Sequence, residues 1–311
     1  MEPQNKKIKI LITGANGFIG KLLMKELQKN PNFETFGADI MNDQSADIKN
    51  FMHVDFCNIS ESLLSTYDYV FHLAAMVGVD ACQNKPDELR LVNLTNTKDF
   101  LSKCVNCKVK KIIFSSSSEI YSNSYKIPYS EKDEPEPFSL YGKCKKEIEI
   151  FLRHLSESNA DTQIMIPRFF NVYGPSQRKD FVVNNFIKRA LTNGDIEIFG
   201  DGNQTRSFTY VDDVVRALRV MLDYNDSKYE IFNIGSRYEC SIKELAQAVL
   251  SLTPESTSKI VFKDYGINGI RSKDLEILRR VPSTEKSKSM LGFEAVVSPE
   301  EGIKAIIKNA K

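Results

Sequence analysis

Residues 8–20, Ile-Lys-Ile-Leu-Ile-Thr-Gly-Ala-Asn-Gly-Phe-Ile-Gly, decide the fold of this chain. Ile8–Thr13 is a short apolar run that predicts a strand, and 18–27 carry helical spacing. Glycines between a strand and a helix allow a sharp turn and let backbone N–H groups approach a pyrophosphate. We therefore predict a dinucleotide-binding strand, turn and helix, with contacts from Gly14, Asn16, Gly17, Phe18, Ile19 and Gly20.

A second apolar run, 33–38, predicts a strand that ends at Asp39. A carboxylate there can accept hydrogen bonds from a ribose diol and repel a 2′-phosphate, which favours NAD over NADP. We expect Asp55 with Phe56, and Leu73-Ala74-Ala75, to flank the adenosine half of the cofactor. A plain capping role is the alternative for Asp55.

Further along the chain, strands at 69–73, 111–116 and 164–169 alternate with helices at 86–107 and 140–155. This alternation predicts an α/β fold with a doubly wound, parallel Rossmann-type sheet that binds ligands at the carboxyl ends of its strands. After residue 172 the alternation weakens, with helices at 181–192, 212–223 and 241–252. We predict a NAD-binding domain over 1–172, to which 205–233 returns, and a smaller C-terminal α/β substrate-binding lobe over 173–204 and 234–311.

Composition restricts the functional class. The 311 residues carry a formal net charge of +1, so no strong field is available to recruit nucleic acid or an anionic membrane. No apolar run reaches the roughly 20 residues needed to cross a bilayer, and we expect a cytoplasmic protein. Cys104 and Cys107 form one C-x-x-C without a second pair at zinc spacing, so we predict reduced thiols and no metal site. The three histidines, at 53, 72 and 154, are interpreted as structural.

Tyr141 and Lys145 lie four residues apart and share one face of a predicted helix. A free phenol has a pKa of about 10, and a fixed positive charge beside it favours the phenolate. Ser117, after a predicted strand, supplies a hydroxyl that can hold a substrate oxygen. These three groups suit the oxidation of an alcohol by hydride transfer.

Taken together, the motifs resemble the extended short-chain dehydrogenase/reductase superfamily, in particular its NAD-dependent sugar-nucleotide epimerases and dehydratases. The resemblance rests on the glycine turn, Asp39, 72–75, Asn93, 115–117, Tyr141 with Lys145, 168–175 and 206–213. It implies that Ser117, Tyr141 and Lys145 are catalytic. It also implies that Asn93, Ser115, Tyr141 and Lys145 contact the cofactor.

The same resemblance implies a nucleoside diphosphate sugar, carrying UDP, GDP or dTDP, as the substrate. Asn171 is similar to an asparagine that contacts the sugar diphosphate, and Arg206 and Arg271 to phosphate-binding arginines. Asp274 fits a contact to the nucleotide ribose. Ser117 and Arg178 complete the predicted substrate site, and Arg271 can equally be a solvated surface residue.

Glu119 decides between reactions that share oxidation at sugar C4. A 4-epimerase needs no further acid or base, whereas dehydratases and decarboxylases use extra groups just after the catalytic serine or threonine. Ser117-Ser118-Glu119 resembles nucleotide-hexose 4,6-dehydratases and UDP-glucuronate decarboxylases. We predict a C4 epimerase, with dehydratase or decarboxylase through Glu119 as the alternative. Lower-ranked alternatives are a C4 reductase or dehydrogenase, a 3,5-epimerase and a non-catalytic NAD-binding protein.

The helices at 86–107 and 140–155 carry apolar residues on more than one side, among them Leu91 and Ile150. Each helix needs only one apolar face for the sheet, so the surplus favours a second partner. Since relatives often pair these helices, we predict a homodimer.

Overall fold

The computed structural model describes residues 6–42, 50–78, 84–121, 126–158, 161–265 and 277–310. The chain forms two compact units. Unit 1 consists of Met1–Ile120, Pro135–Arg168 and Val215–Phe232, and unit 2 of Tyr121–Glu134, Phe169–Val214 and Asn233–Lys311. The predicted division differs from these units at 121–134, 169–172, 205–214 and 233. Residues 121–134 belong to unit 2 because Tyr129 N donates to Val281 O and Ser283 N donates to Tyr129 O.

Unit 1 is built on a sheet with the strand order β12-β7-β5-β4-β1-β2-β3, in which β6 also pairs with β7. All the pairs from β3 to β7 along this order are parallel. The strand order runs outward from β1 in both directions, so the topological switch lies between β1 and β4. The strands are β1 Ile8–Thr13, β2 Phe33–Asp39, β3 Phe51–His53, β4 Tyr69–His72, β5 Lys111–Phe114, β6 Ser116–Ser117, β7 Gln163–Phe169 and β12 Tyr229–Ile234.

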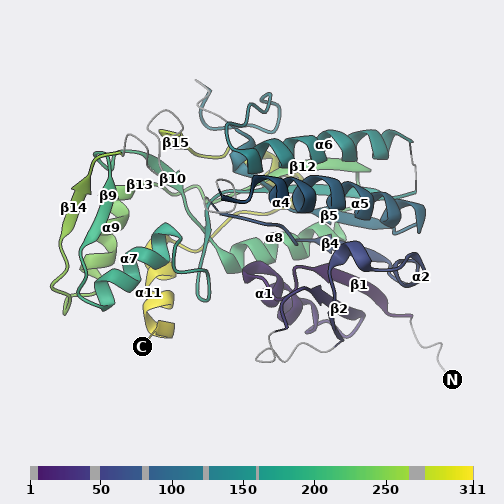
Figure 1. The fold of residues 1–311 in the computed structure, drawn as a ribbon, viewed down its shortest axis with the longest axis horizontal. Helices are drawn as coiled ribbons and strands as arrows, with labels where there is room; N and C mark the ends of the chain where they lie inside the picture. Colours follow the sequence, from purple (N-terminus) through teal and green to yellow (C-terminus); the bar gives the residue numbers. More distant parts are fainter. Residues whose placement is uncertain are drawn as a thin grey trace. The chain divides into compact units, whose positions relative to one another are not determined.

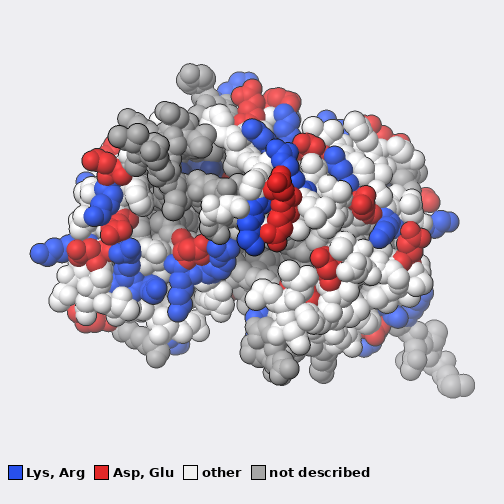
Figure 2. Space-filling view, in the orientation of Figure 1, with Lys and Arg blue, Asp and Glu red and all other residues white. Residues whose placement is uncertain are grey.

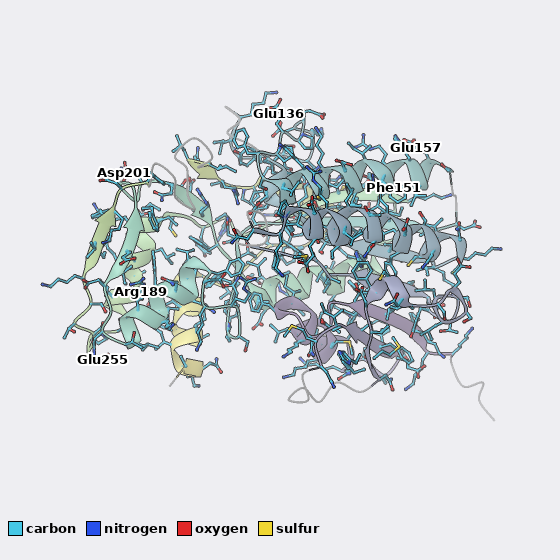
Figure 3. The ribbon with its side chains drawn as sticks, in the orientation of Figure 1. Glu136, Phe151, Glu157, Arg189, Asp201 and Glu255 are labelled. Atoms are coloured by element: carbon cyan, nitrogen blue, oxygen red, sulfur yellow. The ribbon has the colours of Figure 1, made fainter. Side chains whose placement is uncertain are left out.

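Helices cover this sheet (Figure 1). They are α1 Phe18–Leu27, α2 Glu61–Leu64, α4 Pro86–Arg90, a π-helical turn at Leu91–Asn96, α5 Thr97–Asn106, α6 Leu140–Ser158 and α8 Val211–Asp223, with 3-10 turns η1 Phe56–Asn58 and η3 Ser118–Ile120. The apolar sides of α5 and α6 bury Phe100, Leu101, Ile148 and Leu152 in one cluster with strand residues such as Ile112. The two helices also touch at their surface, where Lys98 Nζ of α5 lies 5.8 Å from the ring centroid of Phe151 on α6 (Figure 3).

Unit 2 is assembled from short elements. They are β8 Val172–Tyr173, α7 Val182–Leu191, β9 Ile196–Phe199, β10 Thr205–Ser207, β11 Thr209–Tyr210, β13 Glu239–Ser241, α9 Ile242–Ser251, β14 Ile260–Lys263, β15 Arg279–Arg280, α10 Glu285–Leu291 and α11 Pro299–Ala310. The strands pair as β13-β10-β15, β11-β8 and β14-β9. Helices α7, α9 and α11 bury a second core around Phe186, Leu245 and Ile303. Ser241 and Glu244 form the predicted capping box at the start of α9.

The predicted α/β class and parallel sheet are confirmed, and β1 and α1 have the predicted bounds. Within the described ranges no helix is both long and apolar enough to cross a bilayer. Positive and negative side chains are intermixed on the face shown in Figure 2. Cys104 and Cys107 are free thiols whose pKa values are raised, mainly by burial, which disfavours the reactive thiolate.

Candidate active site

The glycine turn joins β1 to α1 so tightly that side chains would not fit. A Cβ atom on Gly20 would lie 2.1 Å from Gly14 O, and Gly14 itself has φ +71°. Helix α1 begins after Gly17, and no side chain of the described residues caps it. Its first backbone N–H groups therefore remain available to an anion, with the positive end of the helix dipole behind them.

Asp39 stands at the carboxyl end of β2, beside this turn. Its two carboxylate oxygens accept hydrogen bonds from Asn16 N at 3.0 Å and Met41 N at 2.9 Å. The side-chain oxygen of Asn16 is buried and has no hydrogen-bond partner among the described residues. A tight turn with glycine at 14, 17 and 20, an open helix N-terminus and an unsatisfied buried acceptor fit a dinucleotide at this edge of the sheet.

The other predicted cofactor residues lie at the same edge of the sheet, but several of them make contacts that stabilise the fold. Asp55 Oδ1 accepts from Cys57 N at 3.2 Å and caps η1. Phe56 is buried, with its ring edge-on to His72 at 4.8 Å between centroids. Leu73-Ala74-Ala75 follow β4 next to the glycine turn, because a Cβ on Gly14 would lie 2.7 Å from Ala74 N. Contact of these residues with the cofactor stays a prediction.

Asn93 lies in the π-helical turn and holds the loop after β4. Its Oδ1 accepts from Met76 N at 2.8 Å and its Nδ2 donates to Met76 O at 2.7 Å. At the end of the turn the Thr97 hydroxyl donates to Val92 O at 2.9 Å, and it also contacts His72 of β4. A single bulge of this kind is common at functional sites.

His72 connects this turn to the glycine turn. Its Nε2 lies 3.3 Å from Thr97 Oγ1 and its Nδ1 2.8 Å from Thr13 Oγ1. Since the Thr97 proton is used on Val92 O, His72 Nε2 must donate, and Nδ1 accepts from Thr13. Burial, with the Lys145 charge as a smaller cause, lowers the pKa of His72 to about 3. His72 is therefore a neutral, structural histidine.

Helix α6 carries Tyr141 and Lys145 into the protein interior. Lys145 Nζ donates to Ser115 O at 2.6 Å and lies 4.5 Å from the Phe114 ring centroid and 5.5 Å from that of Tyr141. Burial lowers the pKa of Lys145 to about 7, while Cys144 and Glu149 oppose this shift. An ammonium this poorly solvated acts strongly on a neighbouring phenol, because little water screens it.

Ser117 and Glu119 form a turn against the start of α6. Ser117 Oγ accepts from Glu119 N at 3.1 Å, and Ser139 Oγ donates to Glu119 Oε2 at 2.7 Å. Ser139 also accepts from Gly142 N at 2.9 Å and so caps α6. A Cβ on Gly142 would lie 2.3 Å from Glu119 O, so this contact requires glycine. Ser139 and Gly142 were not predicted from the sequence, although a serine just before a predicted helix is a capping signal.

Of the predicted substrate residues, Ser117 belongs to unit 1, and Asn171, Arg178 and Arg206 belong to unit 2. Asn171 Nδ2 donates to Ser207 O at 3.1 Å, which brings it beside Arg206, the preceding residue in β10. Arg178 instead makes a two-pronged ion pair with Asp180, with 2.7 Å between Nη2 and Oδ2. Arg271 and Asp274 lie outside the described residues.

Comparisons with known proteins agree with this geometry. The model of the NAD dependent epimerase/dehydratase family matches residues 10–235. The chain is 36% identical to a UDP-N-acetyl-alpha-D-glucosaminuronate decarboxylase from Bacillus cytotoxicus, over 97% of each protein.

Two solved structures have the same fold. A UDP-glucuronic acid 4-epimerase from Bacillus cereus, in complex with UDP-glucuronic acid and NAD, has a TM-score of 0.87 and 30% identity over 98% of this chain and 100% of its own. A UDP-glucose 4-epimerase from Thermotoga maritima has a TM-score of 0.85 and 29% identity, over 97% and 98% of the two chains. The predicted family, enzyme class and cofactor are thus confirmed, and the chain belongs to the NAD-dependent epimerase/dehydratase family of sugar-nucleotide enzymes.

Proposed function

We propose that this enzyme is a nucleotide-sugar 4-epimerase, which oxidises C4 of its substrate to a ketone and reduces the ketone again on its other face. The observation that carries the proposal is the packing of α6, which buries the Lys145 ammonium beside the Tyr141 ring, one turn away on the same helix. Epimerisation at C4 needs this pair, a hydroxyl such as Ser117, and no further acid or base.

Each residue has a separate task in this proposal. Tyr141 removes the proton of the C4 hydroxyl and later returns it, while the Lys145 charge favours its phenolate form. Ser117 holds the same oxygen by a hydrogen bond. Bound NAD supplies the hydride acceptor and donor at C4. The glycine turn and Asp39 would hold that cofactor through its pyrophosphate and ribose.

We propose a UDP-sugar as the substrate, because several related structures are complexes with UDP-glucose or UDP-glucuronic acid. Asn171 and Arg206 would bind its diphosphate. An arginine fork suits phosphate oxygens, and a chain of net charge +1 needs such local charge to hold an anion. Arg178 is the weaker candidate, since Asp180 already neutralises it.

A second candidate is decarboxylation or dehydration, which Glu119 favours. A 4-keto group acidifies C5 and makes a uronate carboxyl group easy to lose as CO₂, after which C5 must be protonated. Glu119, which accepts a hydrogen bond from Ser139 and whose backbone N–H donates to Ser117, would exchange that proton. The 36% identity to a decarboxylase supports the same branch.

A substrate panel tests both candidates. Purified protein with NAD is incubated with UDP-glucose, UDP-N-acetylglucosamine, their two uronates and dTDP-glucose, and the products are read by NMR. The 4-epimer of one sugar is the expected product, and Tyr141→Phe is expected to reduce turnover about 10²- to 10⁴-fold. Full turnover by Tyr141→Phe would contradict the mechanism.

The variant Glu119→Gln separates the two candidates. In an epimerase it is expected to keep the product and most of the rate. In a decarboxylase or dehydratase it should abolish the loss of CO₂ or water and leave oxidation at C4 measurable at 340 nm. If CO₂ or water is lost at the wild-type rate in Glu119→Gln, the role of Glu119 is wrong.

We also propose a homodimer that uses the outer faces of the π-helical turn and α6. Leu91 and Ile150 lie there with 50% and 46% of their surface exposed, which is unfavourable for large apolar side chains on a monomer. Light scattering at micromolar concentration is expected to give twice the monomer mass of 35.4 kDa. A monomer whose mass does not change with concentration would exclude this assembly.

A further inference from the structure

We propose that Glu149, Arg168 and Ser116 form a buried positioning cluster, which holds Ser117 and Lys145 in place relative to each other. Glu149 and Arg168 make an ion pair with side chains only 5% and 3% exposed. Arg168 Nε and Nη2 donate to the two carboxylate oxygens at 3.1 and 2.6 Å. Ser116 Oγ donates to Glu149 Oε1 at 2.5 Å, so three different elements of unit 1 meet at one carboxylate.

Ser116 connects this cluster to the residues of the candidate active site. Ser116 stands between Ser115, whose carbonyl holds Lys145, and Ser117. Side chains alternate along a strand, so Ser116 points away from the side that carries Ser117. Glu149 follows Lys145 by four residues and lies one turn further along α6.

Two neighbouring hydrogen bonds therefore connect α6 to residues 115–117. One runs from Lys145 to Ser115 O, and the other from Ser116 to Glu149. If the hydrogen bond from Ser116 to Glu149 is lost, residues 115–117 can shift along α6. The Ser117 hydroxyl then moves relative to Tyr141. A misplacement of about 1 Å is enough to cost an enzyme about 100-fold in rate.

The electrostatics lead to the same inference. Replacing a buried ion pair by apolar side chains of similar volume is often neutral or stabilising, so fold stability is a weak reason for this pair. Lys145 is faced by Tyr141, Cys144 and Glu149 on its own helix and by neutral His72 on β4. Cys144 and, to a smaller extent, Glu149 raise the Lys145 pKa against the effect of burial. Glu149 thus also helps Lys145 to keep the proton on which the Tyr141 phenolate depends.

The test uses Ser116→Ala, Glu149→Gln and, as a matched control, Lys111→Met. Lys111 is another buried charge of unit 1, but it donates to the carbonyls of Met221, Leu222 and Tyr224 at the end of α8. Two quantities are measured on protein that melts above the assay temperature. The first is the pH at which the Tyr141 phenol ionises, from the absorbance at 295 nm of each variant minus that of the same variant with Tyr141→Phe. The second is kcat and KM with the best substrate of the panel.

For Glu149→Gln, Tyr141 is expected to ionise about one pH unit higher, with kcat lowered about 10- to 100-fold and KM little changed. Ser116→Ala, which deletes one hydroxyl and keeps the ion pair, is expected to lower kcat about tenfold without changing the pH of ionisation. Ser116→Thr restores the hydroxyl and should restore kcat. Lys111→Met should lower the melting temperature and change neither quantity.

The proposal is overturned if Glu149→Gln and Ser116→Ala only lower the melting temperature, as Lys111→Met does. If Glu149→Gln does not fold, Ser116→Ala with wild-type kcat overturns it alone. The kinetic part rests on the proposed function, whereas the ionisation of Tyr141 is measured without substrate. A shifted ionisation without any turnover on the panel would therefore count against the proposed function and support the positioning role.

Discussion

At the scale of single residues, we expect the Asp39 carboxylate to set the choice between NAD and NADP. Its oxygens already accept two backbone N–H groups, so the side chain is fixed in place before any ribose arrives. Such preorganisation favours a ribose diol and leaves a 2′-phosphate facing a negative charge. We expect Asp39→Asn to weaken NAD binding about tenfold, as for the loss of one charged hydrogen bond, and to strengthen NADP binding.

The chain has no tryptophan, so the cofactor affinities are measured by isothermal titration calorimetry. Asp68→Asn is the control, because Asp68 binds Lys9 N and Lys110 at the opposite end of β1. It should leave both affinities unchanged. Unchanged NADP binding by Asp39→Asn would show that this carboxylate does not exclude the phosphate.

His72 makes stability depend on pH. Its pKa is about 3 in the folded protein and 6.5 when unperturbed, so the folded state binds fewer protons between these values. The stability that neutral His72 contributes is therefore complete above pH 6.5 and is lost as the pH falls toward 3. The loss amounts to about 2 kcal/mol between pH 6.5 and 5.

Urea unfolding at these two pH values measures the effect. His72→Gln cannot titrate and is expected to lose about 2 kcal/mol less than the wild type over this interval. His154→Gln removes an exposed histidine of α6 and should behave as the wild type does. Equal losses in His72→Gln and wild type would show that another group causes the acid sensitivity.

At the scale of elements, Gly142 lets α6 approach the turn that carries Ser117 and Glu119. Alanine is the better helix residue, so Gly142→Ala would stabilise an isolated helix. Here its Cβ would lie 2.3 Å from Glu119 O, and α6 must shift. We expect a loss of about 1–3 kcal/mol in stability and about 10- to 100-fold in kcat.

Thermal unfolding and steady-state kinetics check this prediction against Gly194→Ala. A Cβ on Gly194 has its nearest neighbour at 3.8 Å, which is ordinary contact, so that variant should match the wild type. Wild-type kcat in Gly142→Ala would mean that the approach of α6 does not matter to catalysis.

The same elements show which structural features local sequence patterns can predict. The bounds of β1 and α1 were predictable, because an apolar run, a glycine turn and helical spacing are all local signals. The single helix predicted at 86–107 is instead interrupted by a π-helical turn. At this turn the Thr97 hydroxyl bonds to Val92 O, five residues earlier, and to His72, a partner that periodicity cannot reveal.

At the scale of the whole molecule, pairing between distant parts of the chain could not be predicted from the sequence. Strands such as β8 and β11 have two residues each and show no period at all. The segment around Tyr129 joins unit 2 through partners more than 150 residues away. Tyr141 and Lys145 were predictable because one helix carries both, whereas Ser116, Glu149 and Arg168 lie in three elements and carry no joint signal.

We propose that the site of Ser117, Tyr141 and Lys145 oxidises C4 of a nucleotide sugar and returns the hydrogen to it. The most direct measurement follows deuterium placed on C4 of the substrate that turns over, with NMR of the product. We predict that the product keeps the deuterium on C4, and that Tyr141→Phe gives almost no product. Deuterium found on C6 would instead identify a dehydratase, and its loss to solvent, or wild-type turnover by Tyr141→Phe, would contradict the account.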